Sequence, residues 1–168
     1  MLIDGYNLIR QSPDLAQRDA LDIEEGRKAL IARLAEYRRI RGRTIKITVV
    51  FDGWGSPHMS TQRVTERGVT VFFTRQGETA DAWMKRRVHE MGEGVVVTSD
   101  RDVRDYACRA GIATITSDEF ERRMEEATYT DMKGFDEDDE PSLRPPKKGV
   151  SRRPGKRERK RKSIVGRL

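Results

Sequence analysis

The chain has 168 residues, of which 35% are hydrophobic and 37% charged, and its formal net charge is +6. This length suits one domain with its own core, and no run of 18 apolar residues predicts a membrane span. Residues 1–135 carry 22 charges of each sign, residues 136–140 add five negative charges, and residues 141–168 carry 12 positive charges and one negative. The positive excess is therefore a property of the C-terminal tail.

Cys108 is the single cysteine, which excludes an intrachain disulfide. The N-terminus lacks the basic and then apolar pattern of a signal peptide. We therefore expect a cytoplasmic protein with no membrane partner.

The N-terminal part of the chain predicts a strand, a helix and a second strand. Met1-Leu2-Ile3 is an apolar strand that stops at a turn, Asp4-Gly5. Residues 23–40 place apolar side chains at helical spacing among Arg, Lys and Glu, which predicts an amphipathic helix. Residues 45–51 are rich in β-branched side chains and end at Asp52-Gly53, so they predict a strand that delivers an Asp to a loop.

The rest of the globular region predicts further strands and helices. Strands are expected at 69–73, 95–98 and 112–116, and helices at 79–91, 99–110 and 118–127. Continuously apolar strands joined by helices indicate an α/β fold, in which a central parallel sheet has helices on both faces. We expect one domain over residues 1–128, followed over 129–168 by a disordered acidic hinge and a basic tail.

Acidic residues gather at one predicted edge of this sheet. In an open parallel sheet, ligands bind outside the carboxyl ends of the strands. Six carboxylates follow a strand or open the next helix: Asp4, Asp52, Glu78, Asp81, Asp100 and Asp102. Glu78 and Asp81 are three positions apart, so at a helix start both side chains are expected to face the same cavity.

Carboxylates that lie so close repel one another unless a cation compensates, and hard oxygen ligands favour Mg²⁺ or Mn²⁺. A metal held in this way can activate water and stabilise the leaving oxygen when a nucleic-acid backbone is cut. The structural alternative for each Asp is an Asx turn or a helix N-cap, and Asp102 has the further alternative of only charging the first turn of its helix.

Four motifs occur in order along the chain: Asp4-Gly-Tyr-Asn7, Val50-Phe-Asp-Gly53, Glu78-Thr-Ala-Asp81 and Val96-Val-Thr-Ser-Asp100. Together they resemble the YacP-like NYN family, a branch of the PIN-like nuclease superfamily, over roughly residues 1–127. The resemblance implies a Rossmann-like PIN fold and divalent-metal cleavage of RNA. It also implies metal ligands at Asp4, Asp81 and Asp100.

The same resemblance implies roles for two more residues. Asn7 would orient the metal site or the substrate, with capping of the turn after Asp4 as its structural alternative. Asp52 is similar to an acid that follows the second strand in flap-nuclease relatives. The family often has a second acid directly after the Asp of its third motif, where this chain has Ala82. That departure leaves the number of metals open, with Asp102 as a compensating acid.

The tail is dense in cations that can neutralise phosphates without a fixed fold. We expect RNA contacts from Arg152, Arg153, Lys156, Arg157, Arg159, Lys160, Arg161 and Lys162. Its prolines and charge density resemble the extensions of ribosome-bound proteins. Within the domain, Lys85 and Arg86 follow Asp81 on one predicted helix and are expected to line the approach of RNA.

The leading hypothesis is an endoribonuclease that uses Mg²⁺ or Mn²⁺ and no small-molecule cofactor, and that acts on RNA, with ribosome-associated RNA as a candidate substrate. An alternative is a catalytically degenerate RNA- or ribosome-binding module, which Ala82 keeps open. A flap-type DNA nuclease is disfavoured because the chain is short and lacks a helical extension that would grip DNA.

Overall fold

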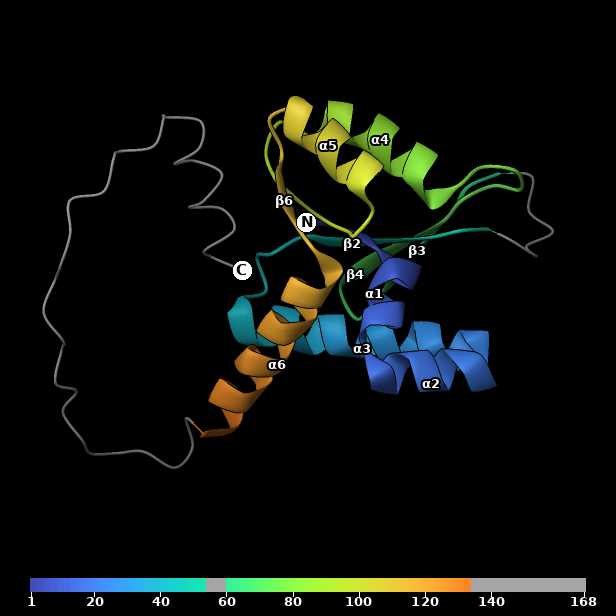
Figure 1. Cartoon of the computed structure of the whole chain (residues 1–168). Helices are drawn as coiled ribbons and strands as arrows, with labels where there is room; N and C mark the ends of the chain where they lie inside the picture. The colour runs from blue at the N-terminus through green and yellow to red at the C-terminus, as the bar shows by residue number, and fades with distance from the viewer. Residues whose placement is uncertain (54–59, 134–168) are drawn as a thin grey trace, which may run out of the picture.

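The computed structural model describes residues 1–53 and 60–133, and all structural statements concern these residues. They contain a six-stranded sheet in the order β3-β4-β2-β1-β5-β6 (Figure 1). The strands are β1 (Leu2–Asp4), β2 (Ile47–Phe51), β3 (Gln62–Glu66), β4 (Val69–Phe73), β5 (Val95–Val97) and β6 (Ala113–Ile115). All neighbouring strands pair in parallel except β3, which is antiparallel to β4 at the edge.

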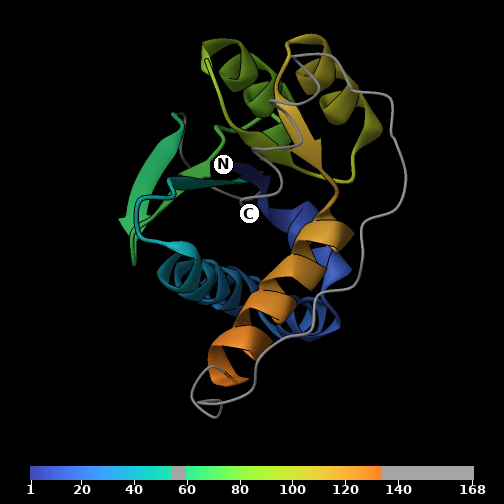
Figure 2. The same ribbon diagram turned by 90° about the vertical axis from the view of Figure 1, so that its left-hand side faces the viewer.

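Helices cover both faces of the sheet, as Figures 1 and 2 show. They are α1 (Gly5–Gln11), α2 (Pro13–Leu21), α3 (Ile23–Arg41), α4 (Ala80–Glu90), α5 (Arg101–Arg109) and α6 (Ser117–Lys133). Helices α4 and α5 lie on one face, and α1, α2, α3 and α6 lie on the other. Among the described helices, none combines the length and the apolar character needed to cross a membrane.

Side-chain alternation along the strands divides the core into two layers. In β1, Leu2 packs with the residues under α4 and α5, whereas Ile3 packs with those under α3 and α6. Both side chains are at most 1% exposed. The central strands β1, β2 and β5 are buried on both faces and are mainly apolar. The expected α/β sheet with helices on both faces is confirmed, and it is parallel apart from the edge strand β3.

The structure also contains elements that the sequence analysis did not predict. Helix α1 begins directly at Gly5, where a turn was expected, and α2 follows it with Pro13 in its first turn. Strand β3 is polar and largely exposed, so it lacks the apolar pattern of the other strands. Helix α6 continues to Lys133, beyond the expected end at residue 127. The predicted tail lies outside the described residues, apart from this last turn of helix.

Two glycines that follow strand-end Asp residues allow close packing. A Cβ atom on Gly5 would lie 2.3 Å from Cε1 of Phe51, and one on Gly53 would lie 1.7 Å from the backbone oxygen of Thr74. Phe51 is fully buried, and its ring contacts Tyr6 edge to face at a centroid distance of 5.2 Å. The glycine of the first motif is therefore required by packing between α1 and β2.

We predict that Gly5→Ala lowers the free energy of unfolding by about 1–3 kcal/mol, because the new methyl group overpacks a rigid aromatic contact. Urea unfolding followed by circular dichroism measures the change. Gly92→Ala is the matched control, since a Cβ atom added there would meet nothing within 4 Å, and it should change stability by less than about 0.5 kcal/mol. Equal stability of the two variants would contradict the packing role of Gly5.

Candidate active site

The candidate site lies at the carboxyl ends of three adjacent strands. Asp4 is the last residue of β1, Asp52 directly follows β2, and Asp100 follows β5 by three positions. Because β1 lies between β2 and β5 in the sheet, these three residues lie side by side at the carboxyl ends of neighbouring strands. Asp81, in the first turn of α4, is the fourth member. We refer to Asp4, Asp52, Asp81 and Asp100 as the carboxylate cluster.

Asp4 is the buried centre of the cluster, with only 7% of its surface exposed. Its Oδ1 accepts a hydrogen bond from the backbone N–H of Asn7 at 3.0 Å, and its Oδ2 accepts one from Oγ1 of Thr98 at 3.2 Å. Burial, together with the nearby charges of Asp81 and Asp52, raises the pKa of Asp4 from 3.8 to about 6 despite these hydrogen bonds. The ionised form of Asp4 is therefore costly in the isolated protein.

Asp81 is half-buried and responds to the same crowding. Its pKa is raised first by burial and then by the negative charges of Asp100 and Asp52, while Lys85 acts in the opposite direction. Asp81, in the first turn of α4, therefore interacts electrostatically with Asp4, Asp52 and Asp100, which lie at or after the ends of three strands. A cation placed among these groups would relieve the repulsion.

Asp52 and Asp100 also build the local structure around the cluster. Oδ1 of Asp52 accepts a hydrogen bond from the backbone N–H of Ala80, which ties the end of β2 to the first turn of α4. Oδ1 of Asp100 accepts from the N–H of Val103 at 2.9 Å and caps α5. The capping role is therefore confirmed for Asp4 and Asp100. Capping does not exclude a role in the cluster, because each carboxylate oxygen can accept more than one interaction.

Asn7 connects three segments behind the cluster. Its Oδ1 accepts a hydrogen bond from the backbone N–H of Ser99 at 2.9 Å and another from Oγ of Ser117 at 2.8 Å. The same side chain thereby joins α1 to the β5–α5 loop, which carries Asp100, and to the start of α6. Asn7 is therefore placed as a positioning residue for this loop.

The sequence analysis missed the hydroxyl groups that complete this network. Thr98 donates to Asp4 and also accepts from the backbone N–H of Asp100 at 3.1 Å, so it connects two members of the cluster. Ser117 is fully buried, and its backbone N–H donates to Oγ of Ser99 at 3.1 Å. Thr98 lies within a motif that was identified, whereas nothing in the local sequence marks Ser117.

Glu78 precedes α4, so the expectation that it opens this helix together with Asp81 was wrong. Helix α4 begins at Ala80 with Thr79 as its N-cap, so Glu78 precedes the helix and the three-residue helical spacing does not apply to it. Its buried carboxylate forms ion pairs with Arg86 and, at 3.5 Å, with Arg75. Glu78 therefore anchors the loop before α4.

Asp102 and Lys85 lie at the rim of the cluster. The Asp102 side chain is 74% exposed and forms an ion pair with Lys85. Lys85 in turn acts electrostatically on Asp81, so this pair borders the site. The eight expected RNA contacts of the tail, from Arg152 to Lys162, lie outside the described residues.

The donor chemistry of the cluster fits a divalent cation. Carboxylate oxygens are the ligands that Mg²⁺ and Mn²⁺ prefer. The pKa of Asp4 is raised because this buried carboxyl lies near two other acids, and a bound cation would stabilise its ionised form. In residues 1–53 and 60–133, no three Asp, Glu, His or Cys side chains are already arranged as a complete metal-binding group. The fit therefore rests on the type and crowding of the donors.

Comparisons with known proteins agree with this geometry. A family model described as the YacP-like NYN domain matches residues 1–158. The uncharacterized protein YacP of Bacillus subtilis is 38% identical over 81 residues, which are 48% of this chain and 46% of that protein, so the match spans about half of the curated relative.

The fold is also similar to solved structures. The crystal structure of Rae1 (YacP) from Bacillus subtilis matches with a TM-score of 0.63 and 27% identity, over 80% of this chain and 78% of that chain. A mutant of the same protein matches with a TM-score of 0.64 and 28% identity, over 77% and 76% of the two chains.

The raised pKa of Asp4 predicts a pH-dependent gain in stability for Asp4→Asn. Because the folded-state pKa of about 6 exceeds the ordinary 3.8, the stabilising contribution of the carboxyl is fully present below pH 3.8 and is lost as the pH rises through about 6. In EDTA, the stability of the variant relative to the wild type should therefore rise by up to about 3 kcal/mol from pH 4 to pH 7.

Urea unfolding at a series of pH values measures this difference. Asp102→Asn is the control with the opposite sign, because its ion pair with Lys85 lowers the pKa of Asp102. That variant should lose stability relative to the wild type as the pH rises. A pH-independent difference for Asp4→Asn would contradict the electrostatic description of the cluster.

Proposed function

Because the chain belongs to the YacP-like NYN domain family, which has a PIN-like nuclease fold, we propose that it is a divalent-metal-dependent endoribonuclease. The observation that carries this proposal is the carboxylate cluster, in which Asp4, Asp52, Asp81 and Asp100 lie at one edge of the sheet. Negative charges that are buried close together lower stability unless a cation compensates them. The crowding of Asp4 and Asp81 with the other acids therefore favours a role in binding a cation.

In this proposal Asp4, Asp81 and Asp100 hold Mg²⁺ or Mn²⁺. When bound, such an ion lowers the pKa of water and offsets the charge that develops on phosphodiester oxygens. The chain's own residues orient the site: Asp52 holds the start of α4, which carries Asp81, and Thr98 fixes Asp4 relative to Asp100. Asn7 holds the loop before α5. These contacts set the positions of the charged groups before substrate binds.

We propose RNA as the substrate and ribosome-associated RNA as the candidate class. The support is the sequence of the tail, where 12 positive charges and one negative charge occur within residues 141–168. Tail contacts with phosphates would add affinity without defining a sequence. The single Cys108 and the likeness of the tail to the extensions of ribosomal proteins support the cytoplasm as the compartment.

A catalytically degenerate binding module is the second candidate, and Ala82 is the feature that favours it. In the structure Ala82 is exposed on α4, whereas its neighbour Asp81 is half-buried beside the other acids. The cluster is therefore assembled without an acid at position 82. This arrangement favours the enzyme over the binding module.

We predict that Asp100→Asn lowers RNA cleavage by at least about 100-fold, equivalent to about 2.7 kcal/mol of transition-state stabilisation. Asparagine retains an oxygen that can cap α5, so the change removes charge while preserving the local fold. Asp105→Asn is the matched control, because Asp105 is exposed on the same helix and lies outside the set of candidate acids. It should retain the activity of the wild type.

Both variants are assayed on structured RNA, single-stranded RNA and DNA, with Mn²⁺ and with chelator. Cleavage of RNA that requires the metal and is lost in Asp100→Asn supports the enzyme. Full activity of Asp100→Asn would overturn the site assignment. Binding of RNA without cleavage by the wild type would favour the degenerate module, and preferential cleavage of DNA would favour the flap-type nuclease.

The tail gives a separate prediction. Deletion of residues 141–168 should weaken RNA or ribosome binding strongly but leave cleavage of a small model RNA largely intact, because all candidate metal ligands lie within the described domain. The slope of log affinity against log salt should become shallower by about 0.7 for each lost contact on single strands. The intact chain in the same titration is the control, and equal slopes would show that the tail does not contact RNA.

A further inference from the structure

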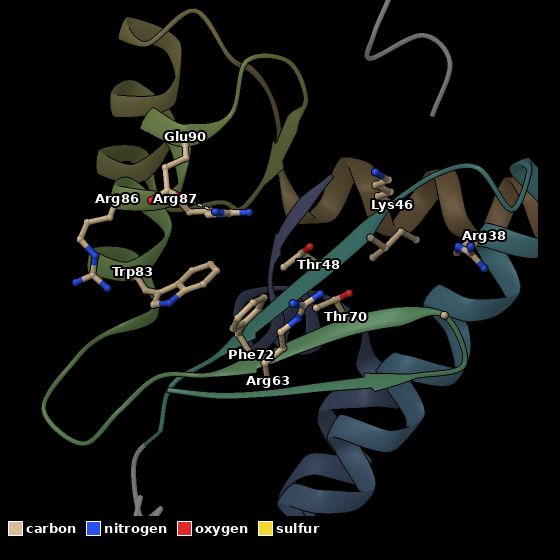
Figure 3. Close-up of a pocket in the computed structure, with 12 residues that line it drawn as sticks. Arg38, Lys46, Thr48, Arg63, Thr70, Phe72, Trp83, Arg86, Arg87 and Glu90 are labelled. Carbon is tan, nitrogen blue, oxygen red and sulfur yellow. Dashed lines mark hydrogen bonds and ion pairs between the residues drawn. The ribbon is translucent and has the colours of Figure 1, made fainter. Parts of the chain in front are cut away.

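A basic groove lies on the α4 face of the sheet (Figure 3). Its cavity volume is about 550 Å³. Its charged lining residues are Arg38, Lys46, Arg63, Arg86, Arg87 and Glu90, so five cations face one carboxylate. These charged residues come from α3, β3 and α4 and from the segment before β2. Segments far apart in the sequence thus bring positively charged side chains together around one cavity.

Some of these cations already have partners. Arg86 pairs with Glu78, Arg87 pairs with Glu90, and Arg38 donates from Nε to the backbone oxygen of Ile45 at 3.0 Å. These contacts fix the directions of three side chains. A fixed guanidinium loses less conformational entropy when it binds an anion than a free one does.

Lys46 and Arg63 are different because both are exposed, and neither forms an ion pair with another part of the chain that the structure describes. Arg63 lies over the ring of Phe72 at 5.9 Å from its centroid. These two cations leave positive charge in the groove that the described residues do not neutralise. An anionic partner would supply the missing charge.

Strands β2 and β4 contribute residues of the sheet to the lining of the groove. Thr48 and Thr70 are paired across β2 and β4, and both are half-buried beside the cavity. Phe72 lies against Trp83, with their ring centroids 4.6 Å apart. Hydroxyl groups and aromatic edges below a row of cations are the groups that contact the phosphates, sugars and bases of a single strand.

The groove extends away from the carboxylate cluster along two elements. Strand β2 begins in the groove at Ile47 and leads to Asp52, about 16 Å away at ~3.3 Å per residue. Helix α4 carries Asp81 in its first turn and presents Trp83, Arg86, Arg87 and Glu90 to the groove on one face. About 16 Å corresponds to about five nucleotides of a stacked strand at ~3.4 Å each.

We infer that this basic groove binds the sugar-phosphate backbone of single-stranded RNA over about five nucleotides on one side of the cut. The inference rests on the proposed function, to which it adds a second substrate contact outside the carboxylate cluster. The cations are spread from α4 to the start of β2 and do not converge on one point, which favours a strand over a small free anion.

The first test measures binding to a fluorescent single-stranded RNA in EDTA, using the full chain. The variant Lys46→Gln/Arg63→Gln removes the two cations that have no ion pair with described residues. If each contacts a phosphate, the slope of log affinity against log salt should become shallower by about 1.4, because each contact contributes about 0.7. Both side chains are exposed, so the melting temperature should stay unchanged.

The matched control is Lys28→Gln/Arg122→Gln, which also removes one Lys and one Arg charge. These residues are exposed on α3 and α6, the helices that cover the opposite face of the sheet. The control should keep the wild-type slope. Equal slopes for the two double variants would overturn the inference, because binding would then depend only on net charge.

A kinetic test separates the groove from the nuclease activity itself. The wild type should have a lower KM for an RNA that extends beyond the groove than for one trimmed to fewer than about five nucleotides on that side of the cut. The groove variant should lose this difference, whereas the control variant should keep it. If the wild type cleaves no RNA but the salt slopes still differ, the groove is supported and the proposed enzyme is overturned. Cleavage with an unchanged length dependence in the groove variant would overturn the groove alone.

Discussion

The electrostatic cost of burying Asp4 is the constraint around which the site is built. Strand β1 is central in the sheet, so the residue at its carboxyl end is surrounded by β2, β5 and α4. Placing a carboxylate there, with Asp52 and Asp81 nearby, raises its pKa to about 6. If this position had no function, replacing the buried Asp4 with an uncharged residue would increase stability. The sequence instead supplies two hydrogen-bond donors to Asp4, which fix its orientation without removing the charge.

The same carboxylates hold the starts of three helices, so fold and site are not separable. Asp4 caps α1, Asp52 holds the first turn of α4, and Asp100 caps α5. A helix N-terminus favours a nearby negative charge, which partly offsets the crowding. Glu78 contributes differently: through its ion pair with Arg86 it connects the loop at the cluster to the basic groove. The segment from Glu78 to Glu90 therefore serves both surfaces that we assign to RNA.

Much of the sheet and the cluster could be predicted because they follow local patterns. Apolar runs that end in Asp mark strand ends, and parallel strands bring those ends together. Helix α1 was missed because Asp4-Gly5 also has the sequence of a turn, whereas in the structure Asp4 caps a helix through its contact with the backbone N–H of Asn7. The place of Glu78 was not predicted correctly because α4 begins at Ala80, one residue later than expected, so Glu78 lies in the loop before the helix. The contacts of Thr98 and Ser117 join segments about a hundred residues apart, for which a single sequence has no signal.

The central claim is that the carboxylate cluster binds a divalent cation. An NMR titration of the Asp4 carboxyl carbon, with EDTA and then with saturating Mg²⁺, tests it most directly because it observes the buried group itself. The account predicts a pKa of about 6 in EDTA and a pKa below the ordinary 3.8 when Mg²⁺ is present. A pKa of Asp4 that stays the same with and without Mg²⁺ would contradict the claim.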